Sequence, residues 1–218
     1  MSGATFDQWV EAVFDHPLSK PEWYWDSGFD EFWGALEMLD PLTVEYMTRL
    51  FLGPDRLNGY SLEQIAQGIW FLIGESSPAA SAHMLLKSSV ALQERTGCVG
   101  AMVNFFTAFV APMAPGAADE RKNPFHIACY MWWDIFPTYG DPNAGEAKLH
   151  DACLNAMAAI LTARSELCQL SALHGLNHWH LHHPTKVESI VDTFLQTTPE
   201  LTSRIVGYAA TARSGSAQ

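Results

Sequence analysis

The sequence has few basic residues and a low overall density of charge. Its 218 residues include 12 Lys and Arg against 24 Asp and Glu, a formal net charge of −12, and charged residues make up only 17% of the chain. A negative surface repels phosphate backbones and anionic lipid headgroups. We therefore expect no binding to nucleic acid or to membranes, and the same charge favours a basic protein as partner.

Cysteine is also scarce, and no two cysteines have the Cys-x-x-Cys spacing of a redox or zinc motif. The opening segment, MSGATFDQW, has neither the basic start nor the apolar core of a secretion signal. These features predict a cytoplasmic protein with free, buried thiols in a reducing compartment. The four cysteines are Cys98, Cys129, Cys153 and Cys168.

No long apolar run is present, and no linker divides the chain. The most apolar stretch, Val99–Met113, is shorter than the roughly 20 residues that cross a bilayer, so we expect a buried core helix there. One helical domain is expected over residues 1–213, followed by a flexible tail over residues 214–218. Apolar residues make up 48% of the chain, which indicates a large core or a surface covered by a partner, such as a second copy in a homo-oligomer.

Helix starts are easy to recognise, whereas no alternating run of β-branched residues predicts a strand. Two segments resemble capping boxes, Ser61 with Gln64 and Thr185 with Glu188. Five more starts place a capping side chain directly before a proline. Seven start signals predict at least seven helices, joined by turns short enough to favour antiparallel neighbours. The proline signals are Asp40-Pro41, Ser77-Pro78, Asn123-Pro124, Asp141-Pro142 and Thr198-Pro199.

Three segments resemble segments of other proteins. Ser171–Leu195, SALHGLNHWHLHHPTKVESIVDTFL, resembles one helix-turn-helix unit of HEAT or armadillo-type proteins. Cys129–Gly140 and Gly59–Leu72 look like segments of uncharacterised bacterial proteins of similar length. The resemblance implies a stacked-helix scaffold, which commonly holds another macromolecule, and it brings no activity with it. We expect an all-α fold of antiparallel helix pairs, as a HEAT-like stack or a compact orthogonal bundle, with no β-sheet.

Histidines gather near the C-terminus. His174, His178 and His182 are spaced four residues apart and would share one face of a helix, where neighbouring pairs can bind Zn²⁺ or Ni²⁺. The common hydrolase signature is absent, because Asn177 and not a glutamate precedes His178. A solvated histidine face near a helix end is the more common meaning of such a pattern. The three histidines are candidate metal ligands, and no other cofactor is expected.

Asp134 lies between aromatic residues in a segment expected to be helical from Phe125 to Phe136. A carboxylate buried there would have a raised pKa suited to acid–base chemistry, with His126 on the same side of the helix. A structural Asp bonded to a helix cap or an arginine is the more common case. No Ser-His-Asp arrangement and no glycine-rich phosphate loop can be recognised, so the sequence assigns no catalytic residue.

The segment Glu22–Trp33, EWYWDSGFDEFW, interleaves aromatic with acidic residues. Trp and Tyr serve as anchors in protein interfaces, and carboxylates beside them attract Lys and Arg of a partner. Alternatively, the aromatic residues close one end of the helical core while the acids face water. The candidate partner-binding residues are Glu22, Trp23, Trp25, Asp26, Asp30, Glu31 and Trp33.

Acidity, many aromatic residues and the lack of a catalytic signature predict a non-enzymatic protein that binds a basic protein. A bacterial immunity protein that neutralises a basic toxin fits this size and charge. Two alternatives stay open. One is a metal-dependent enzyme that uses His174, His178 and His182, and the other is an acidic nucleic-acid mimic that occupies the cleft of a DNA-binding protein.

Overall fold

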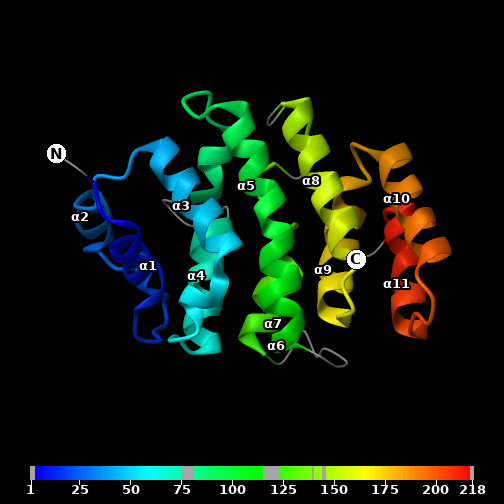
Figure 1. The fold of residues 1–218 in the computed structure, drawn as a ribbon, viewed down its shortest axis with the longest axis horizontal. Coiled ribbons are helices and arrows are strands. Elements are labelled where there is room, and N and C mark those ends of the chain that lie inside the picture. The colour runs from blue at the N-terminus through cyan, green and yellow to red at the C-terminus, as the bar shows by residue number, and fades with distance from the viewer. Residues whose placement is uncertain (1–2, 75–80, 115–122, 139, 144–145, 217–218) are drawn as a thin grey trace.

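The structure, a computed structural model, describes residues 3–74, 81–114, 123–138, 140–143 and 146–216 (Figure 1). Within these ranges the chain forms eleven α-helices, four short 3₁₀ or π-helical segments and no strand. The all-α prediction is confirmed, and the helices exceed the seven whose starts were recognised.

The helices of the first half are α1 (Phe6–Phe14), α2 (Phe29–Gly34), α3 (Asp40–Leu52), α4 (Leu62–Ile73) and α5 (Leu92–Asn104). Those of the second half are α6 (Ala111–Met113), α7 (Pro124–Met131), α8 (Ala147–Ile160), α9 (Glu166–Trp179), α10 (Pro184–Thr197) and α11 (Ser203–Ser214). The 3₁₀ segments are η1 (Trp23–Trp25), η2 (Pro54–Leu57) and η3 (Ser81–Leu86), and η4 (Phe105–Val110) is π-helical.

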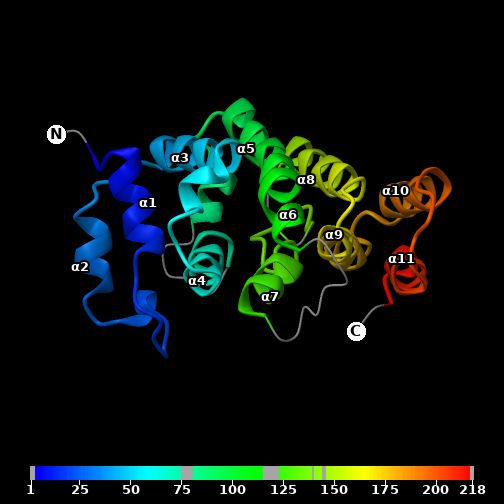
Figure 2. The ribbon, with the colours of Figure 1, turned by 60° about the horizontal axis from the view of Figure 1, so that its bottom comes forward.

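The helices lie in two layers that follow the chain from one end of the molecule to the other (Figures 1 and 2). In one layer α3 contacts α5, α5 contacts α8 and α8 contacts α10. In the other layer α1 contacts α4, α4 contacts α7, α7 contacts α9 and α9 contacts α11. Each helix therefore packs mainly on its neighbours, with α1 and α2 at one end and α10 and α11 at the other.

Local capping chemistry explains where several helices begin. The capping box at α4 is confirmed, because Ser61 Oγ accepts from Gln64 N and Gln64 Oε1 accepts from Ser61 N. The start at Asn123-Pro124 is also confirmed, since Asn123 Oδ1 accepts from Phe125 N at 2.9 Å. Helix α3 does begin at Asp40, but the Asp40 carboxylate does not cap the backbone N–H groups of the first turn. It accepts hydrogen bonds from the side chains of Lys87 and Ser89.

Three predicted starts are wrong. Asp141 folds into a local turn by accepting from Asn143 N at 2.8 Å, and this bond competes with helix formation. Thr198-Pro199 lies in the loop before α11, which Thr202 caps. Thr185 is already inside α10, which begins at Pro184. The signal at Ser77-Pro78 lies outside the described residues.

The longest helix of the described chain runs through α5, η4 and α6, from Leu92 to Met113, so the apolar run Val99–Met113 belongs to a helix of 22 residues. It is long and apolar enough to cross a membrane, a property that core helices share, and Phe105 and Phe106 on it are fully buried. Both rings pack against the buried Trp132. The four cysteines are free and buried, as predicted.

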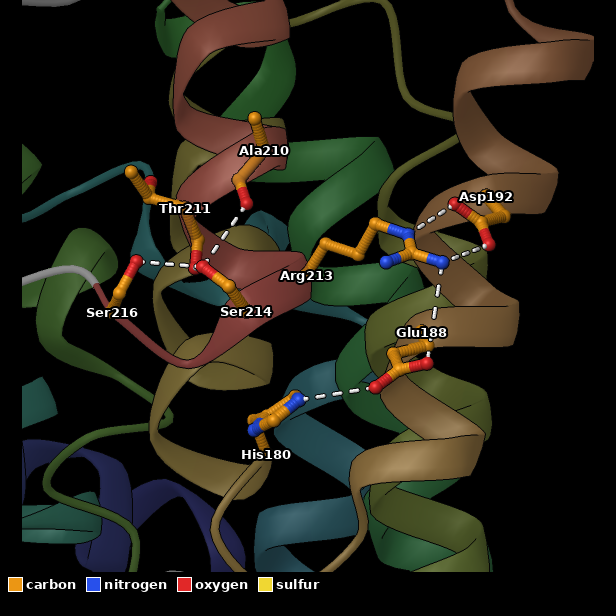
Figure 3. A network of polar contacts seen from close by, with 8 residues as sticks. All are labelled: His180, Glu188, Asp192, Ala210, Thr211, Arg213, Ser214 and Ser216. Atoms are coloured by element: carbon orange, nitrogen blue, oxygen red, sulfur yellow. Dashed lines mark hydrogen bonds and ion pairs between the residues drawn. The ribbon is translucent and has the colours of Figure 1, made fainter.

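A charged network ties the last three helices together (Figure 3). Arg213 of α11 binds both carboxylate oxygens of Asp192 on α10, at 2.6 and 3.0 Å. Glu188 of α10 lies 4.0 Å from Arg213 and 3.5 Å from His180 Nε2, just beyond the end of α9. Helix α11 stops at Gly215, whose φ of +64° is a left-handed conformation that favours glycine.

Candidate functional site

The acidic aromatic segment folds as η1 and α2 at the end of the molecule (Figure 1). Tyr24 and Phe29 are buried. Trp23 and Trp33 are half-buried against Phe71 of α4, with ring centroids 4.8 and 4.7 Å from the Phe71 ring. These four aromatic side chains close the end of the core, as the alternative interpretation expected.

Two aromatic side chains of the segment remain at the surface, Trp25 with 47% of its area exposed and Phe32 with 42%. Asp26, Asp30 and Glu31 are exposed beside them, and Glu22 is half-buried. Phe32 was part of the predicted segment but not of the candidate site residues.

A groove of about 660 Å³ runs between α1 and the segment that contains α2. Phe32 forms part of its wall, and Glu11 and Asp15 bring two more exposed carboxylates from α1. His16 lines the groove and stacks on Trp23 at 3.7 Å between ring centroids. Glu11 and Asp15 were not predicted, although their four-residue spacing places them on one face of a helix.

The second candidate cluster brings together Asp134 and two of the predicted histidine ligands, which the sequence analysis treated as separate sites. His174 and His178 lie one turn apart on α9, and Asp134 lies in the turn that follows α7. Asp134 Oδ2 is 3.8 Å from His174 Nε2, and Asp134 Oδ1 is 3.4 Å from His178 Nε2. One nitrogen or oxygen atom from each of the three residues lies within 4.8 Å of the others.

His182 is not part of this cluster. Helix α9 ends at Trp179, so the four-residue spacing no longer places His182 on the face of His174 and His178, and its side chain is exposed in the turn. His126 lies in α7, which ends at Met131, and is likewise outside the cluster. The histidine face is not simply solvated, because the side chain of His174 is only 12% exposed.

Two tyrosines contact His174 on the part of the imidazole that does not face Asp134. Tyr208 Oη of α11 lies 2.8 Å from His174 Nδ1 and 2.7 Å from Tyr130 Oη, and the ring of Tyr130 stacks on the imidazole with centroids 4.1 Å apart. These partners could not be recognised from the sequence, since they come from two other helices, α7 and α11. The imidazole is therefore fixed in orientation by two neighbouring helices.

The expectation of a raised pKa at Asp134 is wrong. Its polar contact with His174 lowers the pKa of the carboxyl, helped by the charge of His178, and these effects outweigh partial burial. Burial lowers the pKa of His178, although the nearby Asp134 opposes the change. At neutral pH the cluster therefore presents a carboxylate and a neutral imidazole from His178.

Comparison of the chain with protein-family models, with curated proteins and with solved structures found no match.

Proposed function

We propose that the protein is a non-enzymatic, acidic helical scaffold of the HEAT-like kind that binds a basic protein. The contact surface is the end face formed by α1, η1 and α2. The proposal depends on one observation: Trp25 and Phe32 stay exposed in a segment whose acidic residues Asp26, Asp30 and Glu31 are exposed as well. A bacterial immunity protein that neutralises a basic toxin is the specific role we favour.

Few carboxylates of this face form ion pairs with Lys or Arg of the same chain. Among the described residues, Asp7 forms an ion pair with Arg56, and Arg49 lies over the ring of Phe6. No ion pair among these residues involves the two acids that line the groove or the exposed acids of the segment Glu22–Trp33. Lys and Arg of a partner can therefore pair with these acids without displacing an internal cation. The acids concerned are Glu11, Asp15, Asp26, Asp30 and Glu31.

Aromatic anchors would supply most of the affinity. Trp is enriched among interface residues whose truncation costs about 2 kcal/mol or more, which is roughly a 30-fold change in Kd. The carboxylates would mainly speed association, so binding should weaken as salt screens them.

The test uses the untagged full-length protein as bait in extracts of its native host at low salt. A basic protein should be recovered by the wild type and lost with the double variant W25A/F32A. The matched control is L181A, which removes an exposed apolar side chain beyond α9 and should keep the partner. Equal loss with both variants, or repeated recovery of no basic protein, would contradict the proposal. Direct competition between the partner and DNA would indicate that the face acts as a nucleic-acid mimic.

A further inference from the structure

We infer that Asp134, His174 and His178 form a binding site for one divalent transition-metal ion of the Zn²⁺ class. The site lies between the turn that follows α7 and the C-terminal half of α9, away from the acidic aromatic face at the end of the molecule. The inference is independent of the proposed protein-binding function.

The spacing of the three side chains fits a shared ion. Zn²⁺ binds imidazole nitrogen and carboxylate oxygen at about 2.0–2.2 Å, so two ligand atoms at the tetrahedral angle lie roughly 3.4 Å apart. The His178 Nε2 to Asp134 Oδ1 distance is 3.4 Å, and the His174 Nε2 to Asp134 Oδ2 distance is 3.8 Å. One candidate ligand atom from each of the three residues lies within 4.8 Å of the other two, so side-chain rotations that shorten these separations by up to roughly 1.4 Å would bring all three ligands to one ion.

The most specific observation concerns His174 Nε2. This atom is buried and has no hydrogen-bond partner among the residues that the structure describes, although it points toward the carboxylate of Asp134. A polar nitrogen left unsatisfied in this way costs free energy. At 3.8 Å the carboxylate is too far for a hydrogen bond but suitably placed as a second ligand of the same ion. A metal ion between the two atoms satisfies both.

The hydrogen bond at His174 Nδ1 orients His174 Nε2 as a metal ligand. When Nδ1 carries the proton, it donates to Tyr208 Oη at 2.8 Å, and Nε2 then presents its lone pair toward Asp134. Metal-bound histidines almost always donate their other N–H to such a partner, which fixes the tautomer and the ring. Tyr130 extends this support by its bond to Tyr208 and by stacking on the imidazole.

The ligand set selects the kind of ion. Two imidazoles and one carboxylate suit Zn²⁺, Ni²⁺, Co²⁺ or Fe²⁺, whereas Mg²⁺ and Ca²⁺ prefer oxygen ligands alone. The ion can enter from solvent, because the side chains of His178 and Asp134 are 38% and 23% exposed. Three protein ligands leave at least one coordination position for water or an external ligand.

The test is isothermal titration of the untagged, chelator-treated protein with Zn²⁺, together with visible spectroscopy of Co²⁺ as a probe of coordination. We expect about one ion per chain and the absorption bands of a low-coordinate Co²⁺ centre. The variants D134N, H174Q and H178Q should each weaken binding at least about tenfold, and Y208F about tenfold, since loss of an outer partner typically costs 10–100-fold.

The matched control is H182Q, which removes the exposed neighbouring histidine and should leave the affinity unchanged. Circular dichroism of each variant checks that the fold is retained, and the near-isosteric D134N gives a second measurement should a histidine variant fail to fold. Failure of the wild type to bind Zn²⁺ would overturn the inference. So would binding that persists in D134N and H174Q but is lost in H182Q, which would identify adventitious surface histidines.

Discussion

Gly175 in α9 should tolerate no side chain. A Cβ at this position would lie 2.8 Å from the sulfur of Met157 and 2.8 Å from Cγ of Trp133, and it would come closer still to Cβ of Trp133. Favourable contacts between carbon atoms lie at about 3.5–4.0 Å. Because Cβ of Trp133 is attached directly to the backbone, it cannot rotate away. In G175A, helix α9 and the turn after α7 must therefore move apart.

The magnitude follows from two opposing effects. Replacing a glycine inside a helix by alanine stabilises the helix by about 1 kcal/mol. Overpacking a dense core typically costs about 1–3 kcal/mol and occasionally more, and a contact with Trp133 Cβ belongs at the upper end. We expect G175A to lower the free energy of unfolding by about 1–2 kcal/mol. In the matched variant G100A, in α5, the new Cβ would have no atom of the described residues within 4 Å, and the change should raise the free energy of unfolding by up to about 1 kcal/mol.

Urea denaturation followed by circular dichroism measures both variants. G175A has a second effect, because Trp133 precedes Asp134 and His174 precedes Gly175. Separating α9 from this turn should also move His174 away from Asp134 and weaken Zn²⁺ binding, whereas G100A should not. A G175A protein as stable as the wild type would refute the reasoning.

Two further predictions concern titration and thiol chemistry. Burial lowers the pKa of His183 in the folded protein. As pH falls through about 6.5, the unfolded chain therefore binds a proton at this residue before the folded protein does. The contribution of His183 to the free energy of unfolding is complete above this pH and is lost below it. The urea midpoint should therefore be lower at about pH 5.5 than at about pH 7.5, and this difference should shrink in H183Q. An equal difference in H183Q and the wild type would contradict the prediction. The native protein should react with almost no Ellman's reagent, because all four thiols are buried and burial raises the pKa of Cys98 to about 12 and of Cys168 to about 11. Full reaction is expected only in denaturant, and rapid reaction of the native protein would show that the thiols are accessible.

Features set by neighbouring residues were predictable from the sequence. The box of Ser61 and Gln64 and the cap at Asn123 involve atoms two or three residues apart, so the local sequence was enough to recognise them. The similar box expected at Thr185 did not form, because α10 begins one residue earlier, at Pro184. The position of His182 was also open to prediction. Pro184 disfavours helical backbone at His183, so α9 was bound to end close to His182 and the four-residue spacing could not be relied on there.

Features set by contacts between distant helices were not predictable. Asp134 meets His174 across 40 residues of sequence, and Tyr208 joins from a third helix, so neither spacing nor composition relates them. The acidic aromatic segment shows the same limit. Packing on Phe71 decides that Trp23 and Trp33 are half-buried while Trp25 stays exposed, and Phe71 lies far along the chain.

The layered contacts have a thermodynamic consequence. In the part of the chain that the structure describes, the main contacts connect helix α1 to α9 in steps, through α4 and α7. The side chains that line the groove of the end face and those around Asp134 are different residues. When two sites have no element that both reposition, their binding free energies add, and neither ligand alters the Kd of the other. Titrating one ligand in the presence of the other should then give superimposable isotherms, which would leave the end face and the site at Asp134 free to evolve independently.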